Sequence, residues 1–364
     1  MVEKPIKGGV RTSFYFAPNM NNKEIVEHRF YTFEELVEKL KREGLKINDQ
    51  SKLIWYLKSF NYQNVINGYN KPFLINDSYK QYLSCANSQM IINFFNFNRS
   101  ISTLLIGDLH SIEMQLSSSI TYEIMKIINQ FHPGHTIFGV LTTNEKFQLF
   151  ATKKSTKIKQ ISEDFQKNFN ELKENKDFIN SAWQSWEEVP MYSLSLLWTF
   201  GMPIHLFQFL NKELKQKIII NYFPKIDKIS NYTFLCLLYC FRDLRNKISH
   251  NEAIYKFRFE LNKLASKIWF IDTSIDRARI KEIIKNDLSI LLGKDCRRKN
   301  NLKLTSIVKI IAKITNNQAL ENLINEKIIA LKHSINGLVK NENLSCKEAW
   351  KNICDFIGYK DLKH

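Results

Sequence analysis

The sequence predicts a protein built almost wholly of α-helices, and three observations support this fold class. Glycine and proline are scarce, with 11 and 7 residues in a chain of 364. Long stretches carry apolar residues at steps of three and four, the spacing of one face of a helix. Signals for β-hairpins are almost absent. Because hydrophobic residues make up 44% of the chain and charged residues 24%, the composition is that of a folded protein.

The first expected helices are marked by residues that cap helix starts. Thr32 is expected to cap a helix that ends near Gly44, and a second helix is expected from about Asp49 to Phe60. Residues 61–79 are expected to form a loop or turns. The later expected helices cover residues 82–130, one exposed segment within 145–180, two segments within 190–221, residues 231–249, residues 252–270, and a basic run over 276–364.

One stretch, residues 189–211, contains no charged side chain and is long enough to span a bilayer. However, Pro190, Gly201 and Pro203 interrupt any helix that could face lipid. The Gly-Met-Pro run is expected to separate two buried helices. We therefore assign this stretch to the core and expect no membrane partner.

The cysteines favour a reduced protein without a metal or another cofactor. None of the six forms a Cys-x-x-Cys pair, and Cys236 and Cys240 lie one helical turn apart, which suits two small core side chains. No glycine-rich phosphate loop is present. The chain opens on MVEKPIKGGVRTSF, which lacks the apolar run of a secretion signal, so a cytoplasmic location is expected.

The charge balance indicates an anionic partner. The chain has 53 Lys and Arg against 36 Asp and Glu, a formal net charge of +17. A charge of this size is typical of proteins that bind nucleic-acid phosphate or an anionic membrane, and the alternative is a general solubility charge. We expect RNA as the partner.

The most informative segment is residues 231–255, NYTFLCLLYCFRDLRNKISHNEAIY. Apolar residues at steps of three and four predict one buried stripe of an amphipathic helix, formed by Phe234, Leu237, Phe241, Leu244 and Ile248. A second row lies beside it, formed by Tyr239, Asp243, Asn246 and His250. Arg245 lies about 100° around the helix from Asn246 and is long enough to reach the same place.

These residue types suit chemistry on a phosphodiester. The planar fork of an arginine donates two parallel hydrogen bonds to a phosphate, and histidine is suited to moving protons near neutral pH. Together they suffice to cleave RNA without a metal, because the 2′-hydroxyl of the RNA is the nucleophile. The alternative is structural, since a lone histidine near a helix end is often a cap or a surface group.

The run Arg-Asn-Lys-Ile-Ser-His at 245–250 resembles the R-x4–6-H motif of HEPN ribonucleases. Over roughly residues 25–260 the chain is similar to the Abi-like family of bacterial abortive-infection proteins, the AbiD and AbiF group. Shorter landmarks carry this wider resemblance: Gly68-Tyr69, Lys71-Pro72-Phe73, Phe97-Asn98-Arg99, Ile112-Glu113-Met114 and Trp198 to Gly201. Two positions depart from the family, which often has Asp at the place of Asn98 and a second His at the place of Asn251.

The resemblance implies a composite active site in a homodimer, because HEPN domains pair with their motifs facing each other. Arg245 would hold the scissile phosphate, Asn246 would position it, and His250 would act as general base or acid. Asp243 would either orient His250 or pair with Arg242, and we favour the pairing.

Other candidate residues have weaker support. Arg242 and Lys247 beside the motif, and Arg297 and Arg298 further on, are candidate contacts to RNA, with a solvated basic face as the alternative for the latter pair. The basic row Arg277, Arg279 and Lys281 is likewise a candidate contact to the RNA backbone, with a solvated face as the alternative. His110 with Glu113 is expected to be half of a metal site or a pair of hydrogen-bonding residues. His132 with His135 is expected to make a turn, and Trp183 with Trp186 a packing corner.

The sequence thus predicts three regions: an N-terminal helical segment (1–80), a HEPN-type helical domain (81–270) and a basic C-terminal helical region (271–364). The resemblance predicts a metal-independent endoribonuclease toxin of bacterial phage defence, restrained by a small structured RNA. The alternative is a non-catalytic RNA-binding HEPN protein that serves as antitoxin or scaffold. A DNA-binding regulator has little support, because no helix-turn-helix stands out.

Overall fold

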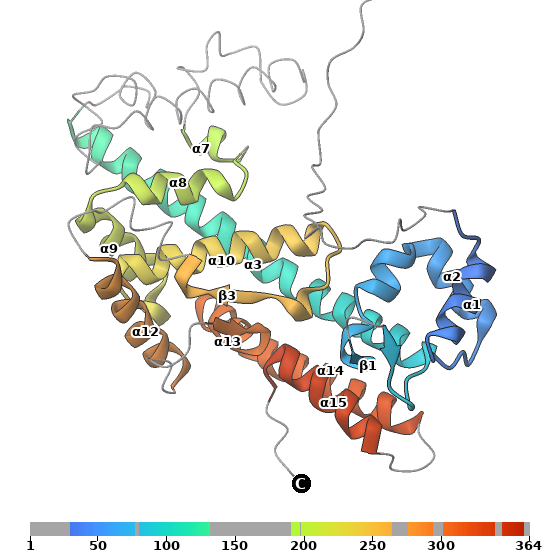
Figure 1. Cartoon of the computed structure of the whole chain (residues 1–364). Coiled ribbons are helices and arrows are strands. Elements are labelled where there is room, and N and C mark those ends of the chain that lie inside the picture. Colours follow the sequence, from blue (N-terminus) through green and yellow to red (C-terminus); the bar gives the residue numbers. More distant parts are fainter. Residues whose placement is uncertain are drawn as a thin grey trace, which may run out of the picture.

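The computed structural model is helical almost throughout the part of the chain that it describes, which confirms the all-α fold class (Figure 1). It describes residues 30–76, 80–131, 191–196, 198–263, 276–293, 301–338 and 344–359. Within these ranges the strands form two small antiparallel sheets, β1 with β2 and β3 with β4. The helices expected within 145–180, the turn at His132 and the corner at Trp183 lie outside the described residues.

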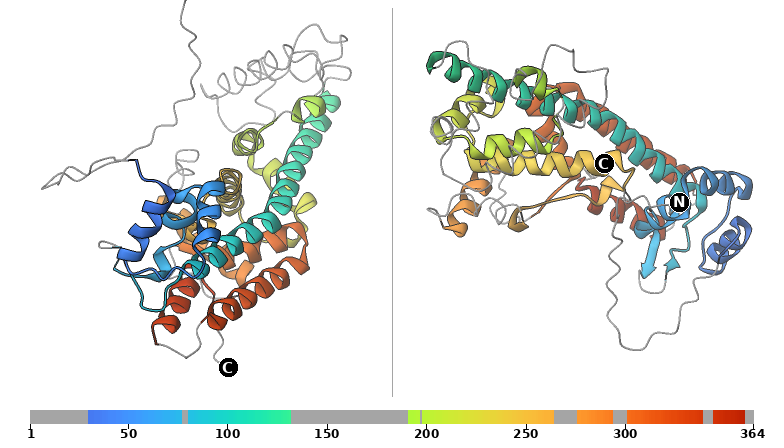
Figure 2. Two further views of the ribbon diagram at one scale, coloured as in Figure 1. Left: turned by 90° about the vertical axis from the view of Figure 1, so that its right-hand side faces the viewer. Right: turned by 90° about the horizontal axis from the view of Figure 1, so that it is seen from above.

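A single long helix, α3 (Ser88–Phe131), is the spine of the molecule. With 44 residues it is about 66 Å long, and it runs from the N-terminal helices to the opposite end of the protein (Figures 1 and 2). It has no proline to interrupt it. One face repeats every three or four residues and is buried along its whole length, through Phe94, Asn98, Ile101, Leu105, Leu109, Ile112, Leu116, Ile120 and Ile124.

The N-terminal helices α1 (Phe33–Arg42) and α2 (Gln50–Phe60) start as the sequence predicts. Thr32 and Glu35 form a reciprocal capping box, and the Asp49 side chain accepts the Lys52 N–H. The segment expected as a loop is more regular than expected. It contains a π-helix, η1 (Gln63–Asn67), a 3-10 turn, η2 (Lys71–Phe73), and a strand, β1 (Leu74–Asn76). The paired strand β2 (Gln81–Tyr82) follows it, so the helix expected from residue 82 begins only at Ser88.

The charge-free stretch packs in the core over most of residues 198–210, as expected, whereas Tyr192 and Leu196 before them are exposed. It forms α7 (Met191–Ser195) and α8 (Gly201–Phe209), followed by α9 (Lys212–Tyr222) and η4 (Pro224–Ile226). The helix break falls before Gly201 rather than at Gly-Met-Pro, because Pro203 lies in the first turn of α8, where no N–H is required. In the described part of the chain, no helix is both long and apolar enough to cross a membrane.

The motif helix α10 (Asn231–Ser249) has the bounds that the sequence predicts. It packs against α3, α8, α9 and α12 (Arg277–Leu292). The carboxylate of Asp287 on α12 holds its first turn by accepting hydrogen bonds from the Ser230 N–H (2.9 Å), the Ser230 hydroxyl (2.7 Å) and the Thr233 hydroxyl (2.5 Å).

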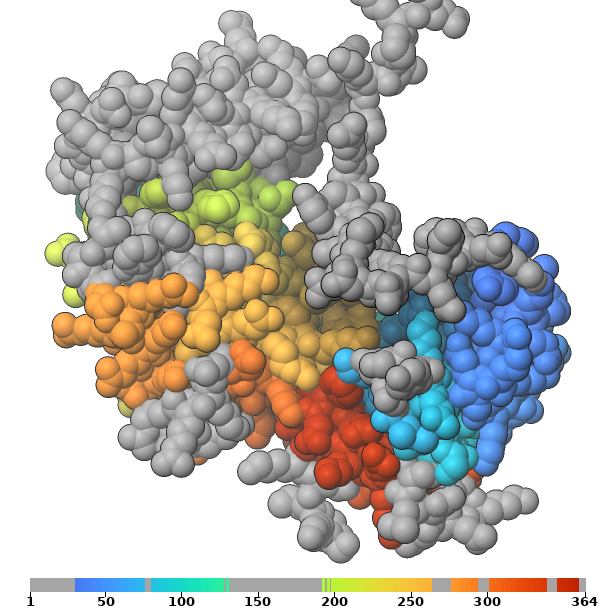
Figure 3. Space-filling model, viewed as in Figure 1, coloured from blue at the N-terminus to red at the C-terminus, as the bar shows by residue number. Residues whose placement is uncertain are grey.

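The C-terminal helices cover another side of the spine. Helices α13 (Leu304–Thr315) and α14 (Gln318–Gly337) pack on α3, and the Asn317 amide donates to both carboxylate oxygens of Asp108. Helix α15 (Leu344–Ile357) lies against η2, where the Asn352 amide donates to the Pro72 carbonyl at 3.1 Å. The space-filling view shows this contact as red atoms against cyan ones (Figure 3).

The helix expected over 252–270 is wrong at its start. Residues 254–260 form a 3-10 turn, η5 (Ile254–Lys256), and a strand, β3 (Arg258–Glu260), which pairs with β4 (Asn301–Lys303). The reason is that buried and more exposed residues alternate here, as they do along a strand. Phe257, Phe259 and Leu261 are buried, whereas Arg258 and Glu260 between them are more exposed. Residues 264–270 of the expected helix lie outside the described part.

Two of the landmarks, Gly68-Tyr69 and Phe97-Asn98-Arg99, meet around Tyr255, which follows the motif helix. Its hydroxyl donates to the Gly68 carbonyl (2.9 Å), and its backbone N–H donates to the Asn98 side chain (3.2 Å). Its ring lies 4.6 Å from that of Phe94 and 5.5 Å from that of Tyr69. The aromatic cluster fixes where the chain goes after α10.

Asn98→Ala is expected to lower the free energy of unfolding by about 1–3 kcal/mol, because it leaves the buried Tyr255 N–H without an acceptor. Urea denaturation measures the change. Asn64→Ala is the matched control, since this exposed side chain makes no hydrogen bond with a described residue, and it should stay within about 0.5 kcal/mol of wild type. Equal losses in the two variants would contradict the structural role of Asn98.

Candidate functional site

The predicted apolar stripe of α10 is buried as expected, which sets the direction of its polar residues. Of this stripe, Phe234, Leu237, Phe241 and Leu244 are at most 1% exposed, and Ile248 is 9% exposed. The predicted second row runs from the core to the surface. Tyr239 is buried and donates its hydroxyl to Gln208 (2.8 Å), while Asn246 and His250 are exposed. The polar end of the helix therefore faces outward.

Arg245 points toward α3 and is held by two neighbours. It donates to the Asn246 side-chain oxygen (3.3 Å), and its Nη2 lies 3.8 Å from Glu113 Oε2. Arg245 and Asn246 are thus in direct contact, as the candidate site requires. The contact of Arg245 with Glu113 places one side of this pair against α3.

Glu113 is the neighbour whose role the sequence did not reveal. It is 9% exposed, and burial raises the pKa of its carboxyl, while the positive charges of Arg245 and His110 act to lower it. Neither Glu113 Oε2 nor Arg245 Nε makes a hydrogen bond to a described residue. The position of Glu113 beside Leu109, Ile112 and Leu116 of the apolar stripe was the available signal, because a buried carboxylate requires a cationic partner. Glu113 thus contacts Arg245 as an ion pair, and the two alternatives for His110 with Glu113 stay predictions.

A cavity of about 880 Å³ opens beside Arg245, Glu113 and His110. Its wall also includes Ser117 and Thr121 from α3 and the buried Trp198. The volume is in the range of small-molecule sites. Arg245 therefore borders a space that can hold a substrate group.

Asn246 and Lys247 border a different cavity, of about 340 Å³, on the β3 side of the helix. Four basic residues and two acidic ones line it, together with Cys240, Asn246 and Phe257: Lys247, Lys256, Arg258, Lys263, Asp243 and Glu260. The mixed charges leave a net positive surface beside the motif.

The other candidate RNA contacts near the motif already have acidic partners. Arg242 pairs with Asp243 at 3.0 Å, which is the favoured of the two roles expected for Asp243, and it stacks on Tyr239. Lys247 pairs with Glu252. Arg297 and Arg298 lie outside the described residues, so their role stays a prediction.

His250 is the C-cap residue of α10. Its backbone N–H donates to the Asn246 carbonyl (3.0 Å), and its exposed imidazole makes no hydrogen bond or ion pair with a described residue. Asn251 follows with a φ of 55°, a left-handed conformation that asparagine tolerates well. The capping alternative thus applies to the backbone of His250 and leaves its imidazole available.

Asn98, where the family often has Asp, serves the turn after the motif. Its side-chain oxygen accepts the Tyr255 N–H, and its amide donates to the Glu252 carbonyl at 3.5 Å. A carboxylate could not make the second of these bonds. The departure from the family pattern therefore suits the local structure.

These features define a class: an all-α protein that presents Arg245, Asn246 and His250 at the exposed end of a helix packed on a long spine. The chain belongs to the Abi-like protein family, whose family model matches residues 55–256. This match confirms the resemblance inferred from the landmarks, and it ends at η5, just past the motif. The HEPN assignment remains a prediction. No curated protein and no solved structure matches the chain.

Glu113→Gln is expected to change how stability depends on pH. Because the carboxyl pKa is raised in the folded protein above its ordinary value of 4.5, wild type should lose stability as pH rises from below 4.5 through the raised value. Glutamine cannot ionise, so the variant should gain stability relative to wild type over that window, as measured by urea denaturation at several pH values.

The matched control is Glu326→Gln on α14, an exposed position that removes the same negative charge. Identical pH profiles for the two variants would show that burial of Glu113 does not control its ionisation.

Proposed function

We propose that this protein is a metal-independent endoribonuclease of the HEPN type that acts in abortive infection. Membership of the Abi-like protein family supports the role in abortive infection. The activity is carried by one observation: the exposed, unbonded imidazole of His250 follows the Arg245–Asn246 pair by about one turn, in a chain of net charge +17.

The proposed reaction uses the RNA itself as nucleophile. His250 accepts the proton of a 2′-hydroxyl while that oxygen attacks the adjacent phosphorus. The bond from phosphorus to the 5′-oxygen breaks, and this oxygen takes up a proton from an imidazolium. The products are a 2′,3′-cyclic phosphate and a 5′-hydroxyl. Arg245 offsets the charge that gathers on the phosphate oxygens, and Asn246 orients the phosphate.

A homodimer is part of the proposal, because Arg245 and His250 lie on different sides of α10. Residues 245 and 250 are five positions apart, which places them about 140° apart around the axis. This divergence supports a site in which Arg245 of one copy and His250 of a second copy act on the same phosphate. A single motif per chain fits this arrangement.

An active ribonuclease needs restraint in its own cell, and we propose a small structured RNA for this role. The excess of 53 basic over 36 acidic residues supports binding of a polyanion. Protein purified from its natural host should carry RNA that dissociates in high salt. Protein that is free of RNA and fails to bind RNA at physiological salt would contradict the restraint.

His250→Ala is expected to lower cleavage of total cellular RNA by about 10²–10⁴-fold, the usual contribution of a general acid or base. The assay contains EDTA, and growth after induction is followed in parallel. His333→Ala is the matched control, because His333 is an exposed histidine on α14. It should retain cleavage and growth arrest.

Cleavage that requires a divalent metal, or that persists in His250→Ala, would overturn the mechanism. If both variants and wild type bind RNA and leave it intact, the protein is a binding module that serves as antitoxin or scaffold.

A further inference from the structure

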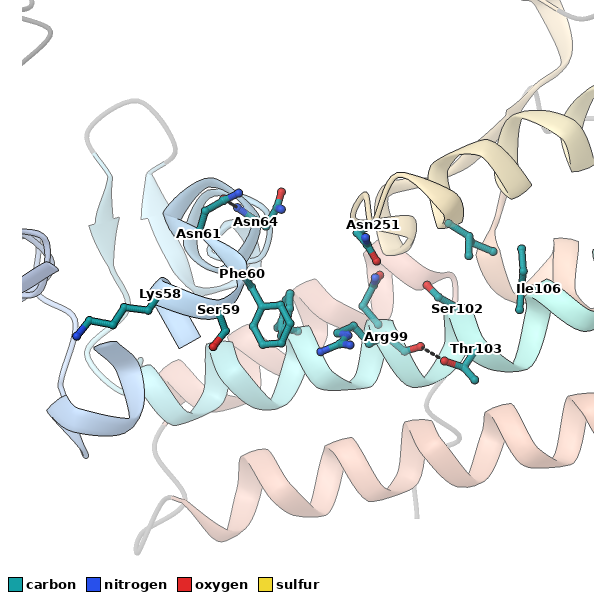
Figure 4. A pocket seen from close by; sticks show the side chains of 13 residues that line it. Lys58, Ser59, Phe60, Asn61, Asn64, Arg99, Ser102, Thr103, Ile106 and Asn251 are labelled. Atoms are coloured by element: carbon teal, nitrogen blue, oxygen red, sulfur yellow. Dashed lines mark hydrogen bonds between the residues drawn. The ribbon is translucent and has the colours of Figure 1, made fainter. Parts of the chain in front are cut away.

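A third cavity, of about 520 Å³, lies where the end of α2, the π-helix η1, the spine α3 and the turn after α10 meet (Figure 4). We call it the Arg99 pocket; thirteen residues line it, including Lys58, Phe60, Asn61, Asn64, Arg99 and Asn251. Two of the thirteen are basic and none is acidic. This charge pattern distinguishes it from the cavity beside Asn246, whose wall contains two carboxylates.

The side chain of Arg99 is exposed and stacks on aromatic rings. Its guanidinium carbon lies 4.6 Å from the centre of the Phe60 ring and 5.7 Å from that of Phe95. Its guanidinium makes no hydrogen bond or ion pair with a described residue. Stacking fixes the plane of a guanidinium while its N–H groups still point outward, so they can donate to a phosphate.

The amide groups around Arg99 divide into structural and available ones. Asn98 is used by the turn that contains Glu252 and Tyr255, and the Asn61 side chain accepts the Asn64 N–H at 2.8 Å. The side chains of Asn64 and Asn251 make no hydrogen bond with a described residue, and Figure 4 shows them on either side of the opening above Phe60 and Arg99. A free amide offers both a donor and an acceptor, which suits the edge of a base.

The position of the pocket relates it to the motif. Ile248 and Asn251, which flank His250 in the chain, form part of its wall. Along α3, one stripe faces first this pocket and then the cavity beside Arg245, through residues 95, 99, 102, 106, 110, 113, 117 and 121. Arg99 and Glu113 on this stripe are about 21 Å apart along the helix. The end of α10 therefore lies between two cavities that share one face of the spine.

We infer that the Arg99 pocket binds an unpaired nucleotide of single-stranded RNA beside the phosphate that is cleaved. Arg99 and Lys58 hold its phosphodiester, and Asn64 and Asn251 contact its base. This inference rests on the proposed function for the identity of the ligand. It assigns a substrate subsite to a landmark, Phe97-Asn98-Arg99, that the motif chemistry does not use.

Binding is measured with the full-length protein carrying His250→Ala, so that the RNA stays intact. The probe is fluorescently labelled single-stranded polyuridylate, and the readout is anisotropy over a range of salt concentrations. Arg99→Ala should weaken binding about tenfold, the size expected for a lost charge-assisted hydrogen bond, and should lower the salt slope by about 0.7. Arg99→Lys should lose less, because it keeps the charge and loses the planar fork.

A second variant tests the pocket by adding a negative charge to its wall. Asn64→Asp adds a carboxylate to a wall that has none and should also weaken binding about tenfold by repelling the phosphate. Arg42→Ala on α1 is the control for both variants, because it too lowers the net charge by one and lies outside the pocket wall. Urea denaturation confirms that each variant is folded.

The inference is overturned if Arg99→Ala and Asn64→Asp bind polyuridylate as Arg42→Ala does, or if the parent protein does not bind it. It is also overturned if uridine monophosphate or duplex RNA competes as strongly as the single strand. Failure of the proposed function can be distinguished from failure of this inference. A wild-type protein that cuts no RNA but needs Arg99 to bind it would refute the ribonuclease activity and leave the RNA-binding site in place.

Discussion

The structure depends on the burial of one continuous face of α3. In proteins most of the stability of a helix comes from the partners that cover its apolar face, and α3 carries such a face over most of its 44 residues. Helices from before and after it in the sequence supply that cover, among them α2, α8, α9, α10, α13 and α14. Because each of them packs on the same rigid element, cavities that lie far apart on the molecule keep a fixed separation. Helix α3 is thus the centre of the fold and also sets the distance between the cavities.

The motif helix is fixed at both ends by polar contacts as well as by its buried stripe. Asp287 holds its first turn, and Asn98 holds the turn that follows its last residue. Between these anchors, Arg245 is directed at Glu113 and Asn246 is directed at the β3 side. The chain therefore keeps its polar residues in place with neighbours that take no part in the proposed chemistry. Burial of Glu113 is the exception, since an incompletely paired carboxyl beside Arg245 links the charge of the site to pH.

The sequence was most informative where structure is local. The bounds of α10, its buried stripe and the caps at Thr32 and Asp49 follow from short-range periodicity and from hydrogen bonds that reach three residues. It was least informative where the partner is distant. β3 pairs with β4 beyond an intervening helix, and the Glu113–Arg245 contact joins two helices that are far apart in the chain. Arg99 was recognisable only as part of a family landmark. That its guanidinium stacks on aromatic rings and has no acidic partner among the described residues is a property of the folded surface.

The cluster around Tyr255 bears on when the site is completed during synthesis. The Tyr255 hydroxyl bonds to a carbonyl 187 residues earlier, and its ring also contacts Phe356 near the end of the chain at 5.4 Å. A nascent chain folds from its N-terminus while later residues are still inside the ribosome. The turn that carries His250 and Asn251 therefore reaches its final packing only after α15 has been synthesised and has docked. Under the proposed function, this order of assembly delays full activity until the C-terminal helices have been made.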